Sequence, residues 1–436
     1  MSRKTVIYQM LPRLWGEGRF SSVDDASLDY LTGLGITHVW YTGVIRHSTA
    51  KPFVKGDPGS PYAICDYWDV NPYLADDESQ RMLEFESLVK RTHCHGLKVV
   101  IDFVPNHLGR DYSDRHGGIP HFEWYDYDWS DTCKIDYGHP ETWEAMYRIV
   151  RFWASKGVDG FRCDMVELVP PEFFRWLIAR IKGEYPGIIF IAEVYQKKKY
   201  REYVEEVGFD LLYDKSGLYD SLRALVGGHG TARAITWNWQ YLGSLQPHML
   251  NFLENHDEQR LASPWFAGSP DHMACLYASL AFNTAPFMIY SGQEIGLDAA
   301  EGHEGRTTIF NRTRPEGLER LYAHIHGADS LESGESKTLQ SYRKALSTAR
   351  EECVGGGLTY DLCYCQDSRG GFDPDMHFAF IRHAAEKTVL VACNFSERES
   401  EVTIDIPRHA SEYLGRPLPA TVIVKLKKFG ATVTTL

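Results

Sequence analysis

Short apolar runs recur along the chain as far as about residue 290, and most are followed by turn residues and a stretch with helical spacing. The run 97–104 is apolar almost without interruption, which is typical of a strand buried on both faces. The pattern predicts strands at 5–14, 36–41, 97–104, 158–165, 188–194, 209–213, 249–254 and 286–290. Strands that alternate with helices indicate a parallel sheet, and eight such repeats predict an α/β fold of the closed (β/α)8 TIM barrel type. No GxGxxG motif follows the first strand, which argues against a dinucleotide-binding sheet.

Two segments depart from this alternation. Residues 107–136 are rich in Gly, Asp, Tyr and Trp, and they are too long for an ordinary strand-to-helix loop, so we expect a small insertion after strand 3. From about residue 350, alternating runs replace the helical spacing and predict an antiparallel β-domain. The predicted domains are a catalytic barrel over 1–350, the short insertion 107–136 within it, and a C-terminal β-sandwich over 351–436.

The amino-acid composition limits the kinds of binding partner that the protein can have. The 436 residues include 46 basic and 59 acidic side chains, for a net charge of −13, and the basic clusters are short. This balance disfavours a nucleic acid or an anionic membrane as partner. The nine cysteines form no CxxC or zinc-type spacing, and the N-terminus lacks an apolar leader followed by a small-residue cleavage site. Reduced thiols and a cytoplasmic location are therefore expected, although a trimmed leader would leave the same sequence.

One short segment, Gly160 to Asp164, places an arginine and an aspartate two residues apart on a predicted strand. Arg162 and Asp164 then point to the same face, and the positive charge is expected to lower the pKa of the carboxylate. An ionised, fixed carboxylate at the end of a strand is what a covalent nucleophile requires. The segment alone fits a structural ion pair equally well.

Polar residues also follow the other predicted strands, and the carboxyl ends of barrel strands meet at one mouth. The third strand ends near Asp102, Asn106 and His107, the fourth at Asp164, the fifth at Glu193, and the seventh at Asn255-His256-Asp257. Crowded carboxylates cannot all ionise easily, so one acid is expected to stay protonated beside an anionic one. Glycoside hydrolysis with retention needs such a pair.

These segments resemble, in order and spacing, the signature regions of the α-amylase family of glycoside hydrolases (family thirteen), with a short domain B. The resemblance covers nearly the whole chain. It implies that Asp164 is the nucleophile, that Glu193 is the general acid and then the base, and that Asp257 stabilises the transition state. It further assigns substrate binding or support of the nucleophile to four residues, Tyr62, His107, Arg162 and His256. Asp102 resembles the family's structural acid behind the site.

The sequence departs from the family in two places. α-Amylases of the family usually carry a Lys-His pair just after the nucleophile, where this chain has Glu167 and Leu168. Many members bind calcium through an asparagine that matches Asn106, and calcium wants six to eight oxygen ligands. Asp111, Asp114, Asp126 and Asp128 are the nearby candidates, yet no EF-hand-like run is present, so a metal-free site that requires no cofactor is favoured. Residues 304–312 are expected to line the donor side.

The expected function is a retaining glycoside hydrolase that cleaves α-glucosidic bonds of starch-like α-glucans or maltooligosaccharides. An exo-acting α-glucosidase and a transglycosylase of the same family remain open, because loop shape decides access to chain ends. A non-catalytic carbohydrate-binding relative is disfavoured, since such relatives typically lose catalytic carboxylates and all three are present here.

Overall fold

The barrel is seen in a computed structural model, which describes residues 4–113, 118–124, 129–281, 284–300, 302–352, 357–384 and 387–436. Eight strands form a closed barrel in the order β1, β13, β12, β11, β10, β9, β5, β2. They are β1 Val6–Met10, β2 His38–Tyr41, β5 Lys98–Phe103, β9 Gly160–Cys163, β10 Ile189–Ala192, β11 Leu211–Tyr213, β12 Met249–Phe252 and β13 Phe287–Tyr290. Each lies within a run predicted from the sequence, so the predicted (β/α)8 barrel is confirmed.

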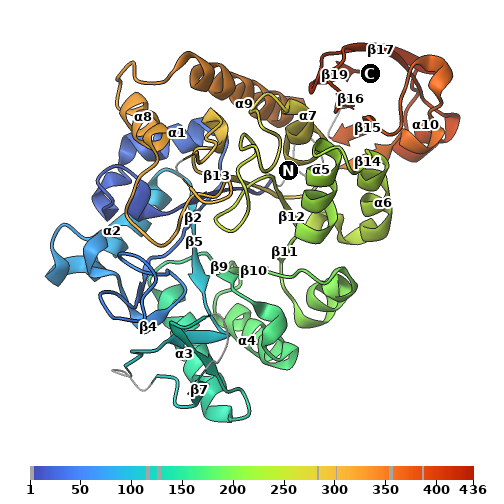
Figure 1. Cartoon of the computed structure of the whole chain (residues 1–436). Coiled ribbons are helices and arrows are strands. Elements are labelled where there is room, and N and C mark those ends of the chain that lie inside the picture. The colour runs from blue at the N-terminus through green and yellow to red at the C-terminus, as the bar shows by residue number, and fades with distance from the viewer. Residues whose placement is uncertain are drawn as a thin grey trace. The chain divides into compact units, whose positions relative to one another are not determined.

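Helices lie between most of the strands (Figure 1). They are α1 Asp25–Leu34, α2 Arg81–Cys94, α3 Pro140–Ser155, α4 Pro171–Glu184, α5 Asp220–Val226, α6 Arg233–Leu242, α7 Met273–Cys275, α8 Glu316–Ile325 and α9 Ser333–Glu352. Local chemistry sets their ends. The Asp24 side chain accepts the Ser27 N–H at the start of α1, and Gly35 takes the left-handed conformation, with φ of 86°, at its end.

Two small sheets accompany the barrel strands in the N-terminal half. One pairs β3 Ile45–His47 with β4 Ile64–Val70. The other has three strands in the order β6, β8, β7, with bounds His107–Gly109, Thr132–Ile135 and Phe122–Trp124. The described residues of the predicted insertion 107–136 therefore contain an antiparallel sheet rather than one long loop.

The C-terminal segment is an antiparallel β-structure, as predicted. Its four-stranded sheet runs β14 Leu358–Asp361, β15 His377–Ala384, β16 Lys387–Asn394, β19 Ala431–Thr435, and a second sheet pairs β17 Ser400–Asp405 with β18 Thr421–Leu426. Alternate residues of these strands share one core, which includes Ile381, Leu390, Ile404 and Val424. The sequence pattern missed α10, Arg408–Leu414, because only Ala410 and Leu414 on its two turns are buried.

The chain divides into two compact units, which are described separately below. The N-terminal unit comprises Ile7–Tyr213 and Thr307–Leu331, and the C-terminal unit comprises Met1–Val6, Asp214–Arg306 and Glu332–Leu436. In the described part of the chain every cysteine is a free thiol. Among the described helices, none combines the length and apolar character that crossing a membrane would require.

Candidate active site

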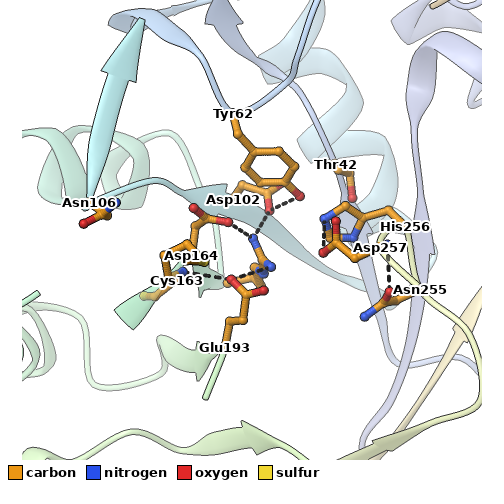
Figure 2. A network of polar contacts seen from close by, with 12 residues as sticks. Thr42, Tyr62, Asp102, Asn106, Cys163, Asp164, Glu193, Asn255, His256 and Asp257 are labelled. Carbon is orange, nitrogen blue, oxygen red and sulfur yellow. Dashed lines mark hydrogen bonds and ion pairs between the residues drawn. The ribbon is translucent and has the colours of Figure 1, made fainter. Parts of the chain in front are cut away.

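The N-terminal unit holds three carboxyl groups around one arginine. Arg162 is fully buried in β9, where the strand register pairs it with Asp102 of β5 and Ile191 of β10. One guanidinium nitrogen, Nη1, lies 2.7 Å from Asp164 Oδ1 and 3.6 Å from Asp102 Oδ1, and the other, Nη2, lies 3.0 Å from Glu193 Oε2. Figure 2 shows the three carboxyl groups turned toward one another. Arg162 and Asp164 do share a face.

Backbone pairing brings the two predicted catalytic acids together. The Asp164 N–H donates to Phe103 O at 2.9 Å, and the Glu193 N–H donates to Cys163 O at 3.1 Å. The parallel ladder therefore continues one residue past β9 and β10, so Asp164 and Glu193 are neighbours on adjacent strands. Close packing holds this register, because a Cβ at Gly160 would lie 2.6 Å from Ile189 Cγ1 and 3.1 Å from its backbone oxygen.

Burial governs the protonation of both acids. Burial raises the pKa of Asp164 above its ordinary value, and the charge of Arg162 opposes this rise. We expected Arg162 to lower the pKa, and its charge acts in that direction, but desolvation of the carboxylate is the larger effect. Burial also raises the pKa of Glu193; Arg162 again opposes the rise, and the neighbouring charge of Asp164 adds to it. The like-charge repulsion thus favours a protonated Glu193 beside an ionised Asp164.

Two donors fix the Glu193 carboxyl group besides Arg162. The Tyr195 hydroxyl donates to Oε1 at 2.5 Å, and the Met165 N–H donates to Oε2 at 2.8 Å. Met165 follows Asp164 directly and has a φ of 47°, which is unusual for a residue with a side chain. Sequence reasoning did not single out Tyr195, although its place two residues after Glu193, at the end of β10, was an available signal.

Asp102 contacts the same guanidinium nitrogen of Arg162 as Asp164, and aromatic side chains donate hydrogen bonds to it. Trp40 Nε1 donates to Oδ2 at 3.1 Å, and the Tyr62 hydroxyl donates to Oδ1 at 3.3 Å. Burial raises the pKa of Asp102 to about 6, against the charge of Arg162. The guanidinium also lies over the ring of Tyr62, 5.4 Å from its centroid, and Arg162 Nε donates to the Tyr213 hydroxyl at 3.2 Å. Trp40 and Tyr213 were not among the residues predicted from the sequence.

His107 faces Asp164 from the start of the insertion. Its Nε2 lies 3.9 Å from Asp164 Oδ2, and burial lowers the pKa of His107 to about 4. The imidazole is therefore neutral at pH 7 and offers hydrogen bonds rather than charge. Asn106 Nδ2 lies 3.2 Å from His107 Nδ1, so the side chain that matches the calcium-binding asparagine of the family is a hydrogen-bond partner of the histidine.

Two acidic side chains of the described part of the insertion are engaged by other residues. Asp131, whose charge acts on His107, is paired with Lys55 Nζ at 3.3 Å, and a lysine is an unfavourable neighbour for a divalent cation. Asp111 is hydrogen-bonded to Ser48. Asp114, Asp126 and Asp128, the other calcium candidates, lie outside the described residues.

One cluster of metal-ligand types lies apart from Asn106. Ligand atoms of His121, His139 and Glu141 are within 4.8 Å of one another. The two imidazole rings stack, with centroids 3.8 Å apart and planes 22° apart. Imidazoles bind an ion through their edges, so these rings would have to rotate to share one, and the cluster lies at the N-terminus of α3, which repels cations.

The C-terminal unit carries the third predicted acid. Asn255 Oδ1 accepts the N–H groups of Asp257 and Glu258, each at 2.8 Å, and so fixes the turn after β12. The buried His256 places Nε2 3.1 Å from Asp257 Oδ2, whose side chain is 40% exposed (Figure 2). Asp164, Glu193, Arg162, Tyr62 and His107 thus gather within the N-terminal unit, whereas His256 and Asp257 form a pair in the other unit.

Of the two positions that depart from the family, Glu167 contacts the loop that follows Glu193. The Glu167 carboxylate accepts the backbone N–H of Tyr195 at 2.9 Å and that of Gln196 at 3.2 Å. Leu168 is 47% exposed, which is high for a leucine.

In the segment 304–312, Arg306 pairs with Glu304 at 3.3 Å, and Arg312 lies 4.3 Å from the ring centroid of Tyr73. The donor-side role of this segment stays a prediction.

The chain was compared with known proteins. It is 28% identical to alpha-amylase MalA of Haloarcula japonica over 426 residues, which cover 91% of this chain and 56% of that protein. It is 29% identical to an alpha-1,4-glucan:maltose-1-phosphate maltosyltransferase of Cereibacter sphaeroides over 242 residues, which cover 47% of this chain and 34% of that protein. The chain therefore spans between about a third and somewhat over half of these curated relatives.

Solved structures share the fold. A noncanonic maltogenic alpha-amylase, AmyB, from Thermotoga neapolitana aligns with a TM-score of 0.72 and 23% identity, over 99% of this chain and 96% of that chain. A cyclic alpha-maltosyl-(1→6)-maltose hydrolase from Arthrobacter globiformis aligns with a TM-score of 0.74 and 18% identity, over 99% and 98%. The family model described as alpha amylase, catalytic domain, matches residues 23–134 and 120–330. Because these residues make up more than half of the chain, the protein belongs to the alpha-amylase family, as the sequence resemblance implied.

Proposed function

We propose that the protein is a retaining glycoside hydrolase that cleaves α-glucosidic bonds of starch-like α-glucans or maltooligosaccharides. The observation that carries the proposal is that Asp164 and Glu193 contact the two terminal nitrogens of one buried guanidinium, at 2.7 and 3.0 Å. Two carboxyl groups held at the ends of one guanidinium fit the short separation of retaining enzymes, roughly 5 to 5.5 Å, better than the roughly 6.5 to 9.5 Å of inverting ones.

In the first step, the ionised Asp164 attacks the anomeric carbon while Glu193 gives its proton to the glycosidic oxygen. The bond to the leaving sugar breaks as the ester to Asp164 forms. In the second step, the ionised Glu193 takes a proton from water, the resulting hydroxide attacks the same carbon, and Asp164 leaves as a carboxylate. The anomeric configuration is retained because it is inverted twice.

The other residues have supporting roles in this proposal. Arg162 holds the negative charge that returns to Asp164, and neutral His107, 3.9 Å from Asp164, hydrogen-bonds the hydroxyls of the cleaved sugar. Tyr62 stacks under that sugar, and Asp257 with His256 binds its hydroxyls as positive charge develops on the ring. We also propose three domains: a catalytic barrel over 1–350, a short insertion within it over 107–136, and a C-terminal β-sandwich over 351–436.

Transfer to a sugar acceptor is the second candidate, because relatives that match 47% of the chain are named maltosyltransferases. An exposed Leu168 in place of a polar acceptor-side residue favours an apolar acceptor site, which would let a sugar compete with water. The chemistry of the first step is the same for both candidates.

Product analysis separates these possibilities. Purified protein is incubated with starch, maltooligosaccharides, pullulan and sucrose, with Asp164→Ala as the control. Several short oligomers from starch indicate endo-hydrolysis, glucose alone indicates an exo-acting α-glucosidase, and products longer than the starting oligomer indicate transfer. Full activity in Asp164→Ala would contradict the proposed mechanism.

A further inference from the structure

Three hydrogen bonds connect the loop after Asp164 with the loop after Glu193, and they run in both directions. From the Glu193 loop, the N–H groups of Tyr195 and Gln196 donate to Glu167 Oε2 and Oε1, at 2.9 and 3.2 Å. From the Asp164 loop, the Met165 N–H donates to Glu193 Oε2 at 2.8 Å. Each loop therefore supplies both a carboxylate and backbone donors to the other.

Glu167 is suited to hold the backbone rather than a sugar. Both of its oxygens accept consecutive N–H groups, and hydrogen bonds to an ionised acceptor are roughly twice as strong as neutral ones. Two bonds to adjacent residues fix the direction of the turn as well as its distance. The side chain is half-buried in a short 3-10 helix, Val166–Leu168, that begins two residues after Asp164.

Tyr195 transmits this constraint to the acid. With its own N–H held by Glu167, its hydroxyl donates to Glu193 Oε1 at 2.5 Å, while Oε2 is taken by Met165 and Arg162. The Glu193 carboxyl group is thus fixed in rotation by donors on both oxygens. The charged or titratable groups that face it are Arg162, Asp164, Tyr195 and His107.

We propose that Glu167 is a positioning residue for the general acid, acting through the loop and hydroxyl of Tyr195. The proposal rests on the function proposed above, because it concerns the proton that Glu193 gives to the leaving group. It explains why the position three residues after the nucleophile is acidic here: its carboxylate serves the neighbouring loop.

Substrates that differ in their need for a proton provide the first test. A maltooligosaccharide needs protonation of the leaving oxygen, whereas α-maltosyl fluoride loses fluoride without it. We expect Glu167→Ala and Tyr195→Phe to lower kcat/KM for the oligosaccharide by roughly 10- to 100-fold, within the range of general acid catalysis, and for the fluoride by less than about 3-fold. Glu172→Gln, an exposed glutamate in the first turn of α4, is the matched control and should change neither value.

The second test follows Glu193 itself and needs no turnover. The Tyr195 hydrogen bond lowers the pKa of Glu193 against the effect of burial, so its removal should raise that pKa. Protein labelled with ¹³C at glutamate carboxyl groups is titrated by NMR, with Glu193→Gln to assign the signal. The Glu193 transition should move to higher pH in Tyr195→Phe, and less so in Glu167→Ala, and the upper limb of the kcat/KM profile should move with it.

The possible outcomes are distinct. Equal losses on both substrates, or an unchanged Glu193 transition in both variants, would overturn the positioning role. A wild-type protein that cleaves neither substrate would overturn the proposed function, and the titration would still decide whether Glu167 and Tyr195 control Glu193.

Discussion

Two fully buried arginines, Arg162 in β9 and Arg260 in the segment after β12, differ in the carboxyl groups around them. In the C-terminal unit, Arg260 pairs with Glu254 at 2.9 Å and lies 4.0 Å from the ring centroid of Tyr290. In the N-terminal unit, Arg162 also lies among aromatic rings but contacts three carboxyl groups. Arg260 is paired with one carboxyl group, although the charge of the buried Glu294 also acts on Glu254. Arg162 contacts three carboxyl groups.

The number of carboxyl groups around each guanidinium distinguishes an ion pair that holds a turn from the proposed active site. Glu254 accepts the Leu261 N–H at 2.9 Å in addition to Arg260, so its site holds a turn together. Around Arg162, one positive charge cannot stabilise three buried carboxylates, so a proton is retained on one of them. A retained proton beside an ionised carboxylate is what the proposed reaction uses.

Neutralising one acid in each cluster should separate them most clearly. We expect Asp164→Asn to lower kcat on maltooligosaccharides by on the order of 10⁴- to 10⁶-fold, as for other nucleophile deletions. Glu254→Gln is the matched isosteric change at the Arg260–Glu254 ion pair, and we expect its kcat to stay within about 3-fold of wild type. Steady-state kinetics with both variants tests this, and comparable losses would contradict the division into a site and a structural pair.

Removing the arginines should affect stability in different ways. Loss of one partner from a buried ion pair costs roughly 3–5 kcal/mol, so both Arg162→Met and Arg260→Met should lower the free energy of unfolding at pH 8. At pH 5 the defect of Arg260→Met should shrink, because Glu254, whose pKa burial already raises to about 6, takes up a proton. Arg162→Met leaves three carboxyl groups without their shared positive charge. More than one of them must take up a proton, so more of the loss in the free energy of unfolding should remain at pH 5. Urea denaturation at both pH values measures this, and parallel recovery of the two variants would count against the charge argument.

The pH dependence of stability should carry a contribution from Glu254. Its pKa is raised from 4.5 to about 6, so between these values the folded protein binds more protons than the unfolded chain. Stability from this group is therefore fully present below pH 4.5 and is lost as pH rises through 6, a change of roughly 2 kcal/mol. In Glu254→Gln the decline between pH 4 and 7 should be smaller by about that amount. An unchanged slope in denaturation experiments would show that Glu254 does not titrate in this way.

Tyr62 should give the smallest effects. Its hydrogen bond to Asp102 is 3.3 Å long, beyond the usual O–H···O range, and a bond so stretched contributes about 1 kcal/mol or less, so Tyr62→Phe should change kcat/KM by less than about 5-fold. If the ring stacks under the sugar, Tyr62→Ala should raise KM by roughly 10-fold, since the apolar contact area is lost. Equal effects of the two changes would indicate that the hydroxyl, not the ring, is the functional group.

Much of this architecture could be predicted from sequence because its signals are local. Each barrel strand is a short apolar run, and the strand ends at Asp164 and Glu193 follow from those runs. The direction in which the pKa of Asp164 shifts could not be predicted, because it depends on how deeply the fold buries the carboxylate. The partners of Glu167 could not be predicted either, since they lie 28 and 29 residues away and are backbone groups without a residue signature.

The proposed mechanism requires Asp164 to form a covalent bond with the sugar. In Glu193→Gln, α-maltosyl fluoride can still transfer its maltosyl group to Asp164, because fluoride leaves without a proton, but water is no longer activated to release it. Intact-mass spectrometry should then detect an adduct of one maltosyl group, and peptide mapping should place it on Asp164. An adduct on another residue, or none in a protein whose wild type is active, would contradict the account.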